Sequence, residues 1–72
     1  MSDNAGAQIL RRHLRRHNAA MVAVECLTSV EMVDHWANGR VIPEYHSRRI
    51  LARLFEDLPV SAWLEKPGEL IF

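Results

Sequence analysis

Apolar residues recur along this chain at the three- and four-residue spacing of amphipathic helices, in short segments separated by turn-forming residues. The first segment begins after Asp3 and Asn4, either of which can cap a helix because its side-chain oxygen accepts a backbone hydrogen bond. We expect this helix to run to about His17, with its apolar stripe around Leu10 and arginines on its other sides.

A second helix is expected from Ala19 to about Leu27, with Asn18 as its cap. Small and apolar residues at helical spacing form its inner face: Ala19, Val22, Ala23 and Cys26. The other side carries Met21 and Val24, so the helix is apolar nearly all round. It should therefore be deeply buried or help to form an interface.

A third helix is expected from Val30 to about Ala37, because Ser29 is a favourable N-cap and is followed by an acid in the first turn. This helix should bury Val33 and Trp36. Its outward positions are Val30, Glu31, Asp34 and His35. Asn38-Gly39 should end it, since glycine readily adopts the left-handed conformation found after a helix C-terminus.

Pro43-Glu44 should open a fourth helix, which Leu58-Pro59 follows as a break. The inner stripe of the fourth helix is Ile50, Leu51, Leu54 and Phe55. A last short helix from Val60 to Leu64 should place Trp63 and Leu64 against the core. The prediction is a compact all-α bundle of about five short helices in one domain, residues 1–72, with 1–6 as a flexible N-terminus and 67–72 as an apolar tail.

Composition agrees with one folded domain and limits what it can do. A chain of 72 residues has room for one core, and 49% hydrophobic with 25% charged residues is typical of a folded globular protein. Cys26 is the only cysteine, so no internal disulfide forms. Neither a secretory signal nor an apolar run of about 20 residues is present, so we expect a cytoplasmic protein that does not bind membranes.

The formal net charge is zero, but the charges are unevenly distributed. Between Gln8 and Arg53 eight arginines face four acids, which leaves an excess of four positive charges. From Leu54 to the end, one lysine faces four acids. The body of the chain is therefore basic and rich in arginine, the residue best suited to phosphate contacts, while the end is acidic.

The order of these elements resembles a known DNA-binding layout. Two short helices lie on either side of a tight turn, and the second is opened by Ser29 and closed by the sequence WANGR. A proline and a further amphipathic helix follow, and LPVSAWL resembles a short closing helix. About two-thirds of the chain thus resembles the Cro and phage-repressor (XRE-type) helix-turn-helix family. Ala23, Val33 and Trp36 match buried positions of that family, whereas Leu27 stands where it usually has glycine.

The resemblance implies a two-fold dimer whose third helix enters the major groove of double-stranded DNA. The implied base contacts are Val30, Glu31, Asp34 and His35. The implied phosphate contacts are Ser29, Arg40, Arg11, Arg12, Arg15, Arg16 and Arg48. The apolar tail residues Leu70, Ile71 and Phe72 are the expected dimer contacts.

No catalytic set is recognisable, so we expect neither an enzyme nor a cofactor. His13 and His17 lie four residues apart, a spacing that can bind metal, but no acid of the same segment joins them and we expect no metal site. The leading hypothesis is a phage- or mobile-element-type transcriptional repressor. The alternative is an interaction module or antitoxin-type adaptor that holds a protein partner through Met21 and Val24 without binding DNA strongly.

Overall fold

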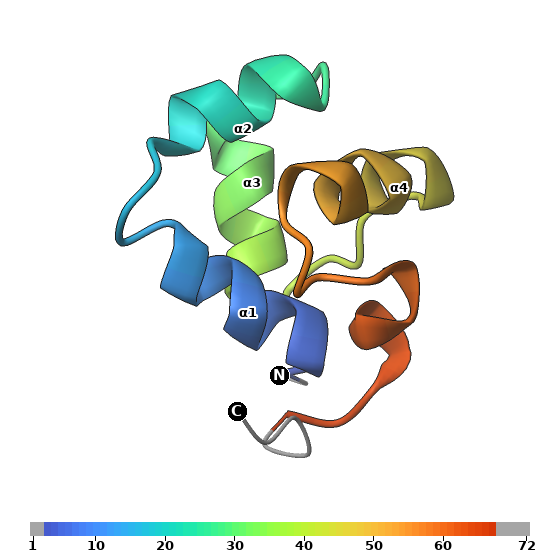
Figure 1. Ribbon diagram of the computed structural model, residues 1–72. Coiled ribbons are helices and arrows are strands. Elements are labelled where there is room, and N and C mark those ends of the chain that lie inside the picture. The colour runs from blue at the N-terminus through green and yellow to red at the C-terminus, as the bar shows by residue number, and fades with distance from the viewer. Residues whose placement is uncertain (1–2, 68–72) are drawn as a thin grey trace.

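The computed structural model describes residues 3–67, which form four α-helices and one 3₁₀ helix (Figure 1). The elements are α1 (Ala5–His13), α2 (Ala19–Glu25), α3 (Val30–Ala37), α4 (Tyr45–Leu54) and the 3₁₀ helix η1 (Val60–Leu64). No β-strand occurs in this part of the chain. The all-helical class predicted from the sequence is confirmed. None of the helices in residues 3–67 is long and apolar enough to cross a membrane.

Helix α3 lies at the centre of the arrangement. It packs against α2 on one side and against α1 on the other, while η1 packs against both α1 and α4 (Figure 1). The largest fully buried side chains come from every one of these elements: Trp63, Ile9, Leu10, Leu51, Leu58, Val22, Val33 and Pro43. With a Cα radius of gyration of 10.8 Å, the chain is a compact globule around one core.

The contact between α1 and η1 depends on a glycine. The indole ring of Trp63 is fully buried and lies so close to α1 that a Cβ atom built on Gly6 would be 2.3 Å from its Cδ2. The indole Nε1 is buried without a hydrogen-bond partner. Beside this contact, the backbone N–H of Ala5 donates to the carbonyl of Glu65 at 2.8 Å. The start of α1 and the end of η1 therefore hold each other in place.

Helix α1 ends at His13, four residues earlier than predicted. After His13 the N–H groups of Arg15 and Arg16 donate to carbonyls three residues back, so the chain tightens into a turn. Leu14 is half-buried, and no further apolar residue follows it before Asn18. Extending the helix would bury no more apolar surface, and turning brings α2 back onto the core.

Several other predictions differ from the structure. Helix α2 ends at Glu25 rather than Leu27, because Leu27 adopts a left-handed conformation. Leu64 is exposed and does not pack against the core. Val24 on α2 is exposed too, so this helix is not deeply buried, and the alternative that it helps to form an interface stays a prediction. Residues 3–6, expected in the N-terminus, carry the cap and first turn of α1, since the side chain of Asn4 accepts from Ala7 N–H.

The starts of α2 and α3 and the end of α3 follow the sequence signals. Ser29 and Asn18 cap their helices as predicted, and Gly39 follows α3 with a positive φ of 73°. Helix α4 begins at Tyr45 with Glu44 as its N-cap, so Pro43, predicted in the first turn, lies before the helix. The predicted dimer contacts Leu70, Ile71 and Phe72 lie outside the described residues.

Candidate nucleic-acid interface

Helix α3 separates its buried and exposed residues cleanly. Val33, Trp36 and Ala37 are buried in the core, as Val33 and Trp36 were predicted to be. Val30, Glu31 and Asp34 are exposed and His35 is half-buried. Because residues three and four apart lie on the same side of a helix, the four predicted base-contacting residues share one stripe. This stripe is the outward surface of the helix.

The N-terminus of α3 is fixed by Ser29. Its hydroxyl oxygen accepts a hydrogen bond from the backbone N–H of Met32 at 3.1 Å, which satisfies one of the N–H groups that have no partner within the helix. Glu31 lies in the first turn, where a negative charge interacts favourably with the helix dipole. The Ser29 cap therefore fixes the start of the helix that carries the outward stripe.

The turn between α2 and α3 has the geometry of a Schellman motif. The N–H of Leu27 donates to Val24 O at 3.2 Å and the N–H of Thr28 donates to Ala23 O at 2.9 Å. Leu27 has a φ of 56°, in the left-handed region that favours glycine. The residue at which the resemblance expects glycine thus adopts the backbone conformation that glycine would take.

The end of α3 repeats this geometry. The N–H of Gly39 donates to Trp36 O at 3.2 Å and the N–H of Arg40 donates to His35 O at 3.0 Å. This turn places Arg40 immediately after the helix with its side chain exposed. Among the arginines predicted to contact phosphate, Arg40 is thus the nearest in sequence to the outward stripe.

The other predicted phosphate contacts lie in two separate places. Arg48 and its neighbour Arg49 flank the ring of Tyr45 on α4, with guanidinium carbons 5.6 and 5.9 Å from the ring centroid. Arg48 is half-buried and its Nε has no hydrogen-bond partner. At the end of α1, an open hollow of about 380 Å³ is lined by Arg12, His13, Arg15, Arg16 and Asp57.

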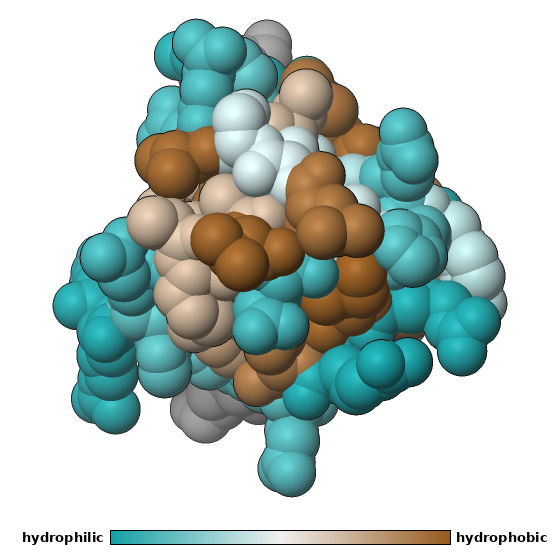
Figure 2. Space-filling view, turned by 90° about the horizontal axis from the view of Figure 1, so that it is seen from above, coloured by the Kyte–Doolittle hydropathy of each residue, from teal (hydrophilic) through white to brown (hydrophobic). Residues whose placement is uncertain are grey.

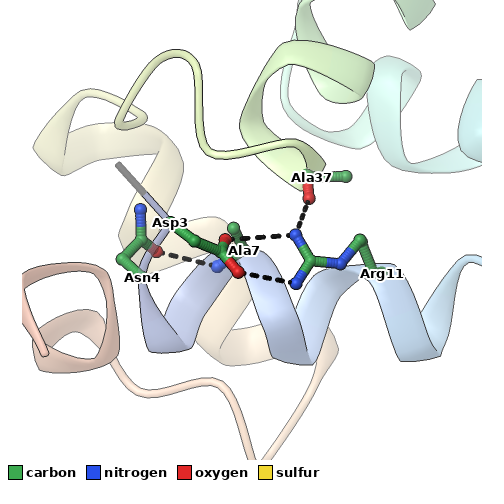
Figure 3. A network of polar contacts seen from close by, with 5 residues as sticks. All are labelled: Asp3, Asn4, Ala7, Arg11 and Ala37. Carbon is green, nitrogen blue, oxygen red and sulfur yellow. Dashed lines mark hydrogen bonds and ion pairs between the residues drawn. The ribbon is translucent and has the colours of Figure 1, made fainter. Parts of the chain in front are cut away.

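Arg11 is committed to contacts within the protein (Figure 3). Its guanidinium donates to both carboxylate oxygens of Asp3, at 3.1 and 2.9 Å, and to the carbonyl of Ala37 at 2.7 Å. Ala37 is the last residue of α3, so Arg11 satisfies a carbonyl that has no partner within the helix. The hydrogen bond from Arg11 holds the pKa of Asp3 below its usual value. A phosphate at Arg11 would compete with this network.

The two histidines of α1 and its following turn surround Phe55. The ring of His13 stacks on Phe55 with centroids 4.1 Å apart, and its Nε2 lies 2.6 Å from a carboxylate oxygen of Asp57. His17 lies 5.4 Å from the same ring, in a tilted arrangement. Nothing in the spacing of the chain pointed to Asp57, which is 44 residues from His13. Within residues 3–67, no three metal-binding side chains come together.

Cys26 is the C-cap of α2 and is buried. Burial raises the pKa of its thiol to about 11, and the negative charge of Glu25 adds to the shift. Because the thiolate is the nucleophilic form of cysteine, Cys26 is unreactive near neutral pH. It acts as a small core residue, as its apolar neighbours in the sequence predicted.

Comparison with known proteins leaves the fold as the only basis for classification. No protein-family model matches the chain, and neither the curated proteins nor the solved structures contain a significant match. The class that the structure defines is a compact all-helical domain of four α-helices and a 3₁₀ helix over residues 3–67.

Proposed function

We propose that the protein is a helix-turn-helix regulator that binds double-stranded DNA, with α2, the turn at residues 26–29 and α3 as the motif. The observation that carries this proposal is the placement of α3. Its apolar side is buried against the core, while Val30, Glu31 and Asp34 are exposed on the opposite side. The N-terminus of the helix is capped by Ser29. A helix with an exposed first turn is the form that enters a major groove in this class of protein.

In this proposal the outward stripe contacts base edges. Val30 meets a thymine methyl group, Glu31 accepts from a cytosine amino group, and His35 donates to a guanine. Arg40 and Ser29 contact phosphates on either side of the helix. The two acids of the stripe, Glu31 and Asp34, oppose the approach of phosphates, so affinity depends on the arginines around it. The regulator acts by occupying an operator.

The test is salt-dependent binding to a fluorescently labelled duplex, followed by anisotropy. Each phosphate that a cation neutralises contributes roughly −0.9 to the slope of log affinity against log salt. We expect binding at low salt that falls steeply as salt is added. No binding at low salt would contradict the proposal.

Two substitutions assign the roles of particular residues. Arg40→Ala should weaken binding to every sequence and reduce the salt slope by about 1, because it removes one phosphate contact. Glu31→Ala should change the preference at one base position, as read by selection of bound duplexes from a random pool. Arg53→Ala, at an exposed arginine of α4 that is not a proposed contact, is the matched control and should change neither.

A second candidate function, an interaction module or antitoxin-type adaptor, is favoured by one observation. Val24 on α2 and Val30 on α3 are exposed apolar side chains near the α2–α3 turn. Exposed apolar side chains suit a protein partner, whereas a DNA-binding surface would have higher affinity with cationic side chains at these positions. The same salt titration separates the two candidates, because an adaptor of this kind does not bind a duplex strongly even at low salt.

A further inference from the structure

The hollow at the end of α1 is strongly positive. It has a volume of about 380 Å³ and is lined by Arg12, His13, Arg15, Arg16 and Asp57. Among the residues that the structure describes, three guanidinium groups and one carboxylate thus line it, which leaves an excess of two positive charges when histidine is counted as neutral. We call this site the arginine hollow.

The arginine hollow is held in place from two distant parts of the chain. His13 stacks on the buried ring of Phe55 with centroids 4.1 Å apart, and its Nε2 lies 2.6 Å from a carboxylate oxygen of Asp57. These contacts join the end of α1 to the segment after α4. The backbone N–H groups of Arg15 and Arg16 donate to carbonyls three residues back, at 3.3 and 3.0 Å. The backbone that carries these arginines is therefore ordered before a ligand binds, which lowers the entropic cost of binding.

Phosphate is the anion that best suits this group of arginines. A guanidinium group presents its donors in a planar fork that can bond two phosphate oxygens at once. A terminal phosphate carries a charge of about −1.5 to −2 near neutral pH, whereas each phosphodiester of a DNA backbone carries a single charge. The excess of two positive charges in the arginine hollow is therefore matched by a terminal phosphate.

We propose that the arginine hollow binds the dianionic phosphate of a small phosphate monoester, with Arg12, Arg15 and Arg16 as donors. The volume of about 380 Å³ lies within the range of roughly 300–1,000 Å³ found for small-molecule sites, so it has room for more than the phosphate alone. The carboxylate of Asp57 repels an entering phosphate and limits its affinity. This inference does not depend on DNA binding. The family resemblance assigns the same arginines to the DNA backbone, so binding of a phosphodiester is the competing outcome.

The experiment is a titration of the isotope-labelled full chain with inorganic phosphate, without DNA, followed by two-dimensional amide NMR spectra. It is carried out at mildly alkaline pH, where inorganic phosphate is mainly dianionic. Dimethyl phosphate, which has the single charge of a backbone phosphodiester, is the comparison ligand. Inorganic phosphate should shift the amide signals of residues 12–17, and dimethyl phosphate should bind about fivefold or more weakly because it lacks one charge at close range. Equal affinity for the two ligands, or no shift at these residues, would overturn the inference.

Substitutions of opposite sign assign the binding to the arginine hollow. Arg15→Ala combined with Arg16→Ala should weaken phosphate binding by about tenfold or more, because it removes two charge-assisted contacts. Both side chains are exposed, and their backbone hydrogen bonds remain in the variant. Asp57→Asn should strengthen binding by about fivefold, since it removes one repelling charge. Arg53→Ala, at an exposed arginine of α4 that does not line the hollow, is the matched control and should leave the dissociation constant unchanged.

Two results with these variants contradict the inference. One is a double arginine variant that binds phosphate as tightly as Arg53→Ala does, and the other is an Asp57→Asn variant that binds phosphate more weakly than wild type. Phosphate binding is measured without DNA and duplex binding is measured by anisotropy, so failure of either proposal is recognised without the other.

Discussion

Leu27 and Gly39 occupy equivalent positions in this protein, the first left-handed residue after α2 and after α3. The hydrogen bonds around them are the same two that define a Schellman motif. Glycine adopts this conformation without strain, whereas a leucine does so at a cost of roughly 1–2 kcal/mol. The ends of α2 and α3 therefore share one backbone geometry, but the end of α2 is less stable because a leucine adopts it.

Leu27→Gly should stabilise the monomer. Relief of the backbone strain outweighs the greater flexibility that glycine gives the unfolded chain, which costs about 0.5–1 kcal/mol, so we expect a gain of up to about 1 kcal/mol. Urea unfolding at a concentration where the chain is monomeric measures it. Gly39→Ala is the opposite change at the matching position and should destabilise by about 1 kcal/mol. A less stable Leu27→Gly variant would show that this side chain packs within its own monomer.

Cys26 should resist alkylation in the folded protein. Its pKa of about 11, against an ordinary 9.0, lowers the thiolate fraction about a hundredfold at mildly alkaline pH. Mass spectrometry should show iodoacetamide labelling at least that much slower than in urea. Because the folded-state pKa lies above the unfolded one, the free energy of unfolding should also fall as the pH rises from 9.0 to about 11. Equal labelling rates in both states would contradict the burial of this thiol.

At the scale of elements, α1 is held by contacts at two points along its length. Gly6 lets the helix approach the ring of Trp63, and Arg11 joins Asp3 to the carbonyl at the end of α3. Both contacts link segments far apart in the sequence. The contact of Arg11 fixes the end of α3, whose outward stripe carries the proposed function.

Gly6→Ala should destabilise the fold strongly. The new Cβ would lie 2.3 Å from Trp63 Cδ2, and the indole ring is fully buried, so the ring or the helix would have to shift. Overpacking of a filled core typically costs about 1–3 kcal/mol, and we expect the upper end or more. Thermal unfolding followed by tryptophan fluorescence measures the loss. Ser61→Ala, at an exposed position of η1, is the control and should change the stability little.

Asp3→Asn should lower stability only where Asp3 is ionised. The hydrogen bond from Arg11 places the folded-state pKa of Asp3 below the ordinary 3.8, so its contribution is complete above 3.8 and is lost as the pH falls through the folded-state pKa. The pair is partly exposed, so the difference from wild type at neutral pH should be below about 1 kcal/mol. Urea unfolding curves of Asp3→Asn and wild type across this pH range test the prediction. Asp34→Asn, at an exposed acid of α3, is the control. A difference that persists in strong acid would exclude the ion pair as its cause.

At the scale of the whole molecule, a neutral chain carries separated charges and an exposed apolar face. The arginines lie at the end of α1 and in the turn after it, after α3 at Arg40, and on α4, and the acids Glu31 and Asp34 lie on the outward stripe. The apolar side chains gather on the face seen from above (Figure 2).

The sequence by itself determined the elements that depend on local chemistry. The caps at Asn18 and Ser29, the stop at Gly39 and the buried Val33 and Trp36 follow from side-chain hydrogen bonds, glycine conformation and helical periodicity, which neighbouring residues set. The predicted outward stripe of α3 followed from the same periodicity.

Only the tertiary structure decided the contacts between distant residues. Arg11 donates to the carbonyl of Ala37, His13 lies against Asp57, and Leu27 adopts a conformation that its identity disfavours. The end of α1 was likewise set by how α2 returns to the core. Packing overrides local preference because the surface buried across the whole domain outweighs the cost at any single residue.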